Sequence, residues 1–224
     1  MKERGMIFNG EMVRAILDGR KTQTRRIMKV QPENAELGLR RITDSSVAKE
    51  VGMYFWCLAD ACGVKNRSKL FSCPFGEVGD RIWVRENFYQ HGQVHQPYYG
   101  EASEPEDAYF LGDRKILYPA DGVALPPERQ RNDCWKSRPS IHMPRWASRI
   151  LLEITDVRVE RLASISQEDA ANEGYPANPE PYGGSMDKWL WFRQLWDSIY
   201  PEQSFSHNPW VWVIEFKRVE GGAT

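Results

Sequence analysis

The fold of this 224-residue chain is decided by the stretch SRILLEITDVRVERL, residues 148–162. Ile150, Leu152 and Ile154 recur at every second position, and side chains two positions apart point to the same face of an extended strand. An alternating apolar face of this kind predicts one long, half-buried β-strand. The segments on either side indicate what that strand packs against.

The segments that follow predict two helices and a last strand. Residues 166–174 begin with a capping box and end at Gly174, which is typical of a short helix. Residues 185–201 place aromatic side chains at helical spacing and stop at a proline. We expect these aromatic residues to belong to the core rather than to a cofactor site. Residues 210–219, WVWVIEFKRV, alternate as a strand.

The N-terminal segment predicts a strand, a helix and a second strand. Met6–Phe8 has the character of a short strand, and Asn9 is placed to cap a helix over Gly10–Asp18. Gly19 supplies the glycine that commonly ends a helix. Lys21–Met28 then alternates well enough to be extended.

Two long segments, at about 30–75 and 91–135, lack this periodicity and are interpreted as insertions. We expect a strand over Met53–Leu58 in the first of them. In the second we expect two short strands, over 108–111 and 116–118.

A clear strand is predicted over Arg81–Tyr89, between the two insertions. Strands and helices do not alternate regularly along the chain, so a doubly wound parallel sheet is not indicated. The sequence favours an α+β fold in which a mainly antiparallel sheet or small barrel has flanking helices. We expect residues 1–224 to form a single domain.

Composition excludes a uniformly basic nucleic-acid binder, because the net charge is −1. The charge is uneven, however: Arg20–Lys29 and Arg129–Arg149 are both strongly basic. Two such segments could hold a phosphate if they meet in space, or they could be separate solvated faces. No run of about 18 apolar residues occurs, and no apolar signal-peptide core follows Met1, so we expect a cytoplasmic protein without a membrane span.

The four cysteines, Cys57, Cys62, Cys73 and Cys134, lack the CxxC spacing of a zinc knuckle. Free thiols are expected in a reducing compartment. A zinc site built by the first three cysteines with a histidine stays open as an alternative. We assign no cofactor and no metal.

The most reactive combination of side chains lies in GRKTQTRR, residues 19–26. A lysine in a partly dry pocket can lose its proton and activate a hydroxyl as a nucleophile, provided that a carboxylate orients it. Lys21 and Thr24, at a junction of helix and strand, are candidates for these two roles. The GxxxxGK[ST], HExxH and GxSxG motifs are all missing from the chain.

Four segments together resemble the ASCH domain family, which has a PUA-like β-barrel fold. They are ILDGRKTQTRR (16–26), VGDRIWVRE (78–86), SISQEDAANEG (164–174) and WVIEFKRV (212–219). With SIHMPRWASRI (140–150), the chain is most similar to longer ASCH-domain proteins of phages and prophages, which implies the cytoplasm of a host cell.

Small bacterial members of this family remove the acetyl group from N4-acetylcytidine with a lysine, a threonine and a glutamate. The resemblance carries the lysine, as general base, to Lys21 and the nucleophilic threonine to Thr24. It carries the glutamate, as proton shuttle, to Glu173, with Glu168 as the alternative. It thus implies a hydrolase that acts on an amide bond of an N4-acylated cytidine. Arg26 and the amides near Gly79 are candidates for oxyanion stabilisation.

Other PUA-like proteins bind RNA or modified bases without reaction, and some ASCH proteins are ribonucleases, so the resemblance also allows an RNA-binding or modified-DNA-binding module. Arg20, Arg25 and Arg26 would then contact phosphate. Trp83 or Trp146 would stack on a base, although Trp83 could instead be a core residue.

Four further residues are weaker candidates for the same ligand. Arg85 and Glu86 follow Trp83 on alternate faces, so one of the two is expected to point into the cleft. Arg145 is either a phosphate contact or a surface arginine, and His142 is either a site residue or a packed one.

Overall fold

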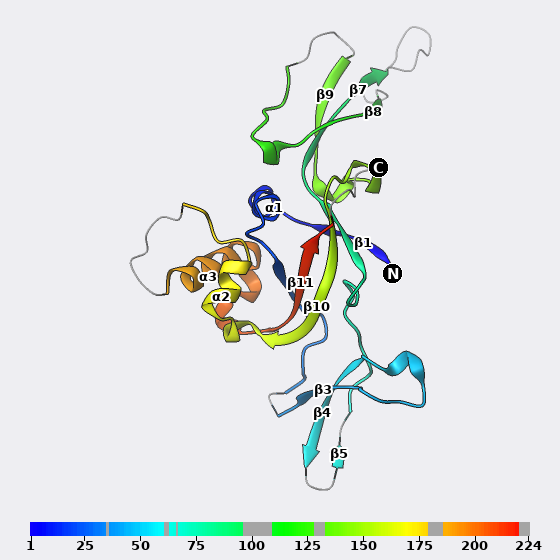
Figure 1. The fold of residues 1–224 in the computed structure, drawn as a ribbon, viewed down its shortest axis with the longest axis vertical. Helices are drawn as coiled ribbons and strands as arrows, with labels where there is room; N and C mark the ends of the chain where they lie inside the picture. The colour runs from blue at the N-terminus through cyan, green and yellow to red at the C-terminus, as the bar shows by residue number, and fades with distance from the viewer. Residues whose placement is uncertain are drawn as a thin grey trace.

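The computed structural model describes residues 1–34, 36–60, 63–65, 67–95, 109–127, 133–178 and 186–219. A central body carries the helices on one side, and two β-sheet arms extend from it in opposite directions (Figure 1). The lower arm comprises the described residues between 36 and 75. The upper arm comprises those between 87 and 138.

The body is built on a five-stranded sheet in the order β1-β6-β10-β11-β2. These strands are β1 (Glu3–Ile7), β2 (Gln23–Ile27), β6 (Arg81–Arg85), β10 (Leu151–Arg161) and β11 (Trp210–Arg218). The long strand predicted over 148–162 is confirmed as β10, and it pairs antiparallel with both β6 and β11. The sheet is mixed rather than purely antiparallel, because β1 pairs in parallel with β6.

The alternation of β11 divides the interior of the body into two cores. Trp212 and Ile214 face the core that β10 and the first helix also contact. Val211 and Val213 face a second core beneath the other two helices. All four side chains are at most 2% exposed, so both faces of this strand are covered.

The first helix, α1 (Gly10–Leu17), joins β1 to β2 and has the cap predicted for it. The side chain of Asn9 accepts a hydrogen bond of 2.8 Å from the backbone of Met12. Gly19 follows with φ of +75°, a left-handed conformation that glycine adopts at no steric cost. This turn sends the chain directly into the basic segment that precedes β2.

The second core is covered by α2 (Gln167–Asn172) and α3 (Asp187–Ile199). The hydroxyl of Ser166 accepts from the backbone of Asp169 at 3.0 Å, which confirms the predicted cap of the short helix. Phe192 and Trp196 of α3 are buried, in agreement with a core role for its aromatic stripe. Single-turn 3₁₀ helices occupy 48–50, 119–121, 140–142, 145–147, 162–164, 201–203 and 205–207.

The described strands do not close into a barrel, since β1 and β2 remain the two edges of the sheet. A side chain joins these edges instead: Arg26 Nη2 of β2 donates to the backbone oxygen of Ile7 in β1 at 2.8 Å. The predicted α+β class is confirmed, and the hydrogen-bonded barrel that we expected is absent from the described part of the chain.

The lower arm is a three-stranded antiparallel sheet of β3 (Gly38–Arg41), β4 (Tyr54–Asp60) and β5 (Gly63–Lys65). The strand predicted over Met53–Leu58 is confirmed as β4. Trp56, only 1% exposed, packs into the body core and donates its indole N–H to the backbone oxygen of Val30. The arm is therefore anchored by an aromatic side chain at its base.

The upper arm consists of β7 (Phe88–His95), β8 (Tyr109–Leu117) and β9 (Asp133–Arg138), all antiparallel. The single strand predicted over 81–89 is wrong, because it divides at Glu86 into β6 and β7. The two short strands predicted near 108–111 and 116–118 form one strand, β8. Within the described residues, no helix is long and apolar enough to cross a bilayer.

Candidate functional site

Lys21 lies where the ends of α1, α2 and β2 meet. Its backbone forms an isolated antiparallel bridge with Glu173, and its amide donates to the carbonyl of Ala15 at 3.0 Å. The next amide, that of Thr22, donates to Asn172 at 2.9 Å. Backbone hydrogen bonds thus hold the lysine against the end of α2, even though about 150 residues of chain separate the two segments.

The side chain of Lys21 donates two hydrogen bonds to Glu173. Its Nζ donates to the carboxylate Oε2 at 2.7 Å and to the backbone oxygen of the same residue at 2.8 Å. The lysine side chain is fully buried and that of the glutamate is 3% exposed. Burial lowers the pKa of Lys21 below its usual 10.5, because desolvation of the ammonium outweighs the attraction of Glu173. Glu168, the alternative glutamate, is exposed.

Arg25 completes the ionic cluster on this side of β2. Its guanidinium is fully buried and contacts three carboxylates at 3.1–3.2 Å, those of Glu160, Asp169 and Glu173. Its side chain also lies over the ring of Phe192, 5.9 Å from the centroid. Arg25 is therefore a buried structural cation, and the expected phosphate contact is wrong for the arrangement seen here.

Thr24 is separated from this cluster by the pleat of the strand. It pairs with Ile214, which faces the body core, whereas Arg25 pairs with Val213, which faces the second core. The Oγ1 atom of Thr24 is buried and has no hydrogen-bond partner. The structure thus joins Lys21 to Glu173 but does not bring the lysine into hydrogen-bond distance of the threonine.

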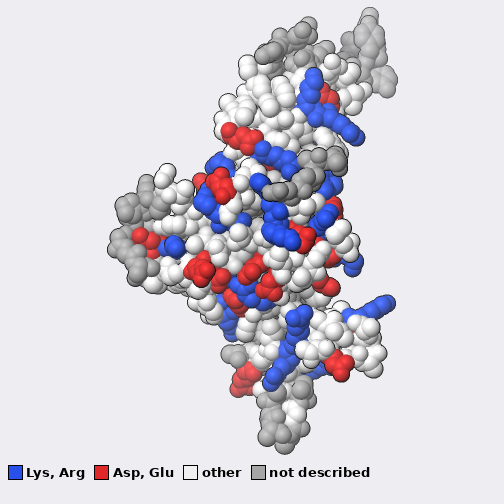
Figure 2. Space-filling view, in the orientation of Figure 1, with Lys and Arg blue, Asp and Glu red and all other residues white. Residues whose placement is uncertain are grey.

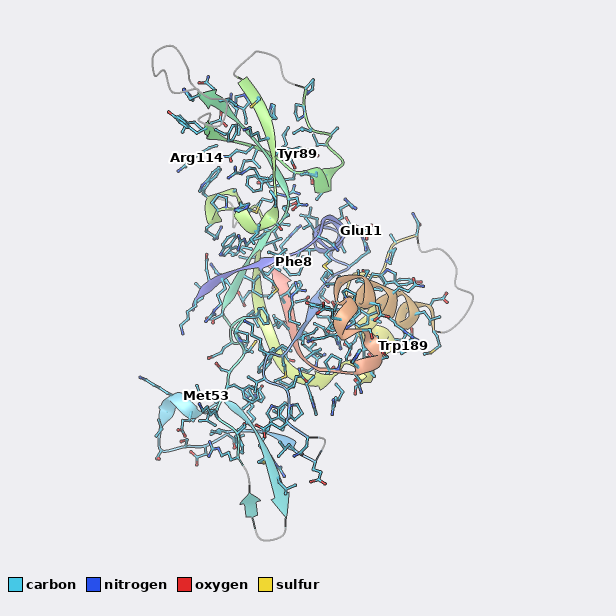
Figure 3. All side chains as sticks on the ribbon, turned by 180° about the vertical axis from the view of Figure 1, so that it is seen from behind. Phe8, Glu11, Met53, Tyr89, Arg114 and Trp189 are labelled. Atoms are coloured by element: carbon cyan, nitrogen blue, oxygen red, sulfur yellow. The ribbon has the colours of Figure 1, made fainter. Side chains whose placement is uncertain are left out.

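A cavity of about 220 Å³ opens beside the buried pair. Glu11 and Arg14 of α1 form one wall, Trp191 and Leu195 of α3 form another, and Glu173 also lines it. Figure 3 shows Glu11 on α1 and, next to that helix, the helices that include Trp189. Glu173 thus bonds to Lys21 and is also one of the residues around the cavity, although its side chain is only 3% exposed.

Sequence reasoning missed three of these cavity residues. Trp191 lies one position before Phe192, outside the stripe of Trp189, Phe192, Trp196 and Ile199, and a single aromatic residue beside such a stripe gives no sign of a cavity. Glu11 and Arg14 are the polar positions of an amphipathic helix, a pattern that ordinarily indicates a solvated face. Only the tertiary fold, which places α1 and α3 around the same cavity, brings these residues together.

Arg20 also lines the cavity, but much of its hydrogen-bonding capacity is used. It donates to Asp18 at 2.7 Å and to the backbone oxygens of Gly174 and Tyr175 at 3.3 and 2.9 Å. The two proposed oxyanion groups do not meet at the site. The amide of Gly79 donates to Ile154, and Arg26 bonds to Ile7.

Most of the other binding candidates lie on a separate surface formed by β1, β6 and the turn after β9. Trp83 is half-buried and covers Gly5, where a Cβ atom would lie 2.6 Å from the indole ring. Arg85 extends over this indole and donates to the carbonyls of Ser140 and Ile141. None of these residues lines the cavity beside Glu173.

The remaining members of that surface are more exposed. Arg145 pairs with Glu3 at 3.0 Å, Trp146 is 43% exposed, and His142 is exposed at the end of its 3₁₀ turn. The predicted ligand-binding residues therefore lie in two separate places, some near Lys21 and the others on this surface. Trp83 is neither a core residue nor a wall of the cavity at Lys21.

Glu86 points inward and forms a second buried ionic group. Its carboxylate accepts two hydrogen bonds from Arg149, at 2.9 and 3.1 Å, and Arg149 also pairs with Asp121 at 2.7 Å. Burial raises the pKa of Glu86, and the hydrogen bonds from Arg149 oppose that rise. The guanidinium lies 3.9 Å from the ring of Tyr118, so this group ties the upper arm to β10.

Cys62 lies outside the described residues, so the structure does not test a zinc site that would include it. Cys57, Cys73 and Cys134 are free thiols. In the described part of the chain, no three histidine, cysteine or acidic side chains are grouped as metal ligands. Comparisons of the chain with protein-family models, curated proteins and solved structures found no match.

Proposed function

We propose that this chain is an ASCH-type hydrolase with a PUA-like body, which removes the acyl group from an N4-acylated cytidine-type base. The single observation that carries the proposal is the position of Glu173. Its carboxylate is bonded to a buried lysine of lowered pKa, and the residue is among those that line a cavity. Carboxylates and lysines with perturbed pKa values beside a cavity are characteristic of catalytic sites.

The fold supports the family assignment through α1 and the two edges of the sheet. The helix connects β1 to β2, and Arg26 bridges these edges where a barrel would close. This contact between the two edges supports the family that the motifs suggest.

The cavity favours a small substrate. Its volume of about 220 Å³ lies below the ~300–1,000 Å³ usual for ligand pockets, so it suits a single base better than an oligonucleotide. Trp191 offers an aromatic wall for a planar base.

In the proposed reaction, Thr24 Oγ1 attacks the acyl carbon and its proton passes through Lys21 and Glu173 to the departing nitrogen. The C–N bond then breaks, cytidine leaves, and water hydrolyses the threonine ester to release the acid. Thr24 is buried and does not line the cavity, so the nucleophilic role requires a movement on substrate binding. The role of Glu173 requires none.

The test is chromatographic detection of cytidine from N4-acetylcytidine. We expect the native chain to form cytidine, and Lys21→Ala, Glu173→Gln and Thr24→Val to lose at least 100-fold in rate, the lower range for loss of a general base. Thr22→Ala is the matched control, because Thr22 is exposed on the same segment. It should retain the native rate.

Two results would decide against parts of this mechanism. If the Thr24→Val variant were active, threonine would not be the nucleophile, and the mechanism would instead use a water molecule activated by Glu173. Absence of cytidine with the native chain, at micromolar concentration over hours, would reject the substrate and leave a binding module as the better description.

A further inference from the structure

The lower arm carries exposed cations that have no carboxylate partner. Arg40, Lys49, Arg67 and Lys69 are all exposed. In the described part of the arm, no lysine or arginine side chain lies in an ion pair. The arm also contains acidic residues, such as Glu50, so the lack of pairing is not due to a lack of carboxylates.

One of these cations lies over an aromatic ring, and a second is its cross-strand neighbour. Arg67 lies over Phe55 at 4.3 Å from the ring centroid. Arg40 is directly opposite Phe55 in the register of β3 and β4, which places their side chains on the same face of the sheet. Guanidinium planes and aromatic rings are the two groups on which unstacked bases stack in protein complexes.

The upper arm has a similar arrangement, in which its cations lie over Phe110 of the arm itself and over Trp146 of the 3₁₀ turn at 145–147. Arg114 lies over Trp146 at 5.6 Å, and Lys136 lies over Phe110 at 4.9 Å. Arg114 and Lys136 are exposed and without a carboxylate partner among the described residues. Lys115 is exposed and forms no ion pair there, although it interacts electrostatically with Asp113. Figure 3 shows Arg114 on the sheet of the upper arm, and Figure 2 shows lysine and arginine side chains on both arms.

We propose that the two arms form a binding surface for single-stranded nucleic acid. Free cations supply the contacts with phosphates, and the stacked pairs supply platforms for bases. An acidic peptide or a lipid surface would use the same charge but has no planar groups to place on Phe55 and Trp146. This inference does not depend on the hydrolase activity, since no arm residue named here lines the cavity at Glu173.

The experiment is fluorescence anisotropy with labelled 20-nucleotide single-stranded RNA and DNA, at several salt concentrations. The lower-arm variant is Arg40→Gln/Arg67→Gln/Lys69→Gln, and the upper-arm variant is Arg114→Gln/Lys115→Gln/Lys136→Gln. The control is Lys2→Gln/Lys29→Gln/Lys188→Gln, which removes three exposed, unpaired cations from the body. All three variants change the net charge equally.

Each arm variant should reduce the slope of log K against log salt by about 2, since each phosphate contact on a single strand contributes about 0.7. The control variant should leave the slope near the native value. Phe55→Leu should weaken binding about 5- to 150-fold, which corresponds to the loss of one stacked base. The comparison of RNA with DNA shows which of the two nucleic acids is preferred. Binding of either one supports the proposed binding surface.

Three outcomes would overturn the proposal. The first is the absence of binding by both oligonucleotides at low salt. The second is an arm variant whose slope equals that of the control. The third is a duplex of the same length that binds as tightly as the single strands, because paired bases cannot stack on the arms. Thermal unfolding of each variant, expected to match the native protein, separates loss of binding from loss of fold.

Discussion

In the body, Arg25, Arg149 and Arg158 each contact two or more carboxylates, whereas Arg40, Arg67 and Arg114 of the arms contact none. The difference follows from burial. A guanidinium removed from water must be paired and hydrogen-bonded, because an isolated buried charge is very costly. An exposed guanidinium has water as its partner and remains available for a ligand.

The comparison teaches that the basic residues of one chain serve two purposes. Within the body they bind distant segments together, as Arg25 does for β2, β10 and α2. On the arms they are held in place by aromatic rings without being neutralised. The first prediction tests this division directly, and two further ones test how the body treats its other buried polar groups, from the largest expected effect to the smallest.

The largest effect is expected for Arg25→Met. The substitution leaves three carboxylates without their shared cation in a buried setting, so the free energy of unfolding should fall by about 3–5 kcal/mol. Urea denaturation followed by circular dichroism measures this loss.

Arg67→Met is the matched variant on the lower arm. Arg67 is exposed and unpaired, so its replacement should change stability by about 0.5 kcal/mol or less. If the two variants lost similar stability, the division between structural and available cations would be wrong.

The second prediction concerns Thr24, whose buried hydroxyl has no hydrogen-bond partner among the described residues. Thr24→Val replaces Oγ1 with a methyl group of similar shape, so it removes a desolvation cost of about 1–3 kcal/mol. We expect the variant to be more stable than the native chain by an amount within that range, in the same denaturation experiment. Thr22→Val, at an exposed position, should leave stability nearly unchanged.

A gain in stability together with a loss of hydrolysis would identify Thr24 as a residue kept for function. A loss of stability greater than about 1 kcal/mol would mean that the hydroxyl has a partner, such as an ordered water, and is structural.

Local signals predicted the elements of this fold well. Asn9 and Ser166 cap the helices assigned to them, and the alternation over 148–162 gives β10. These features depend on neighbours within a few residues, which the sequence displays directly. The parallel pairing of β1 with β6 depends instead on segments about 78 residues apart, and no local pattern encodes that register.

The candidate site was predictable only in part, for a related reason. Lys21 and Glu173 were chosen together, and they do contact each other. The basic run that contains Lys21 suggested exposed phosphate contacts, but Arg25 of that run is buried because its carboxylate partners come from β10 and α2. The cavity wall at Trp191 depends on how the fold places α3 relative to α1, which is a tertiary property.

The smallest expected effect is the pH dependence that Lys21 gives to the stability of the body. Its pKa in the folded chain is lower than its usual 10.5, since burial disfavours the ammonium more than Glu173 favours it. As the pH falls from 10.5, the unfolded chain takes up a proton at this lysine before the folded chain does. The stabilising contribution is therefore complete above pH 10.5 and is lost as the pH falls through the folded pKa.

The measurement is the difference in unfolding free energy between the native chain and Lys21→Met, from neutral pH to 10.5. That difference should shift in favour of the native chain as the pH rises, while Lys29→Met, at an exposed lysine, should show no such trend. The subtraction removes the titration of tyrosines and other lysines, which both proteins share. A shift in the opposite direction would mean that Glu173 stabilises the ammonium more than burial disfavours it. Lys21 would then be a permanent cation of the body, like Arg25, rather than a base that can accept a proton.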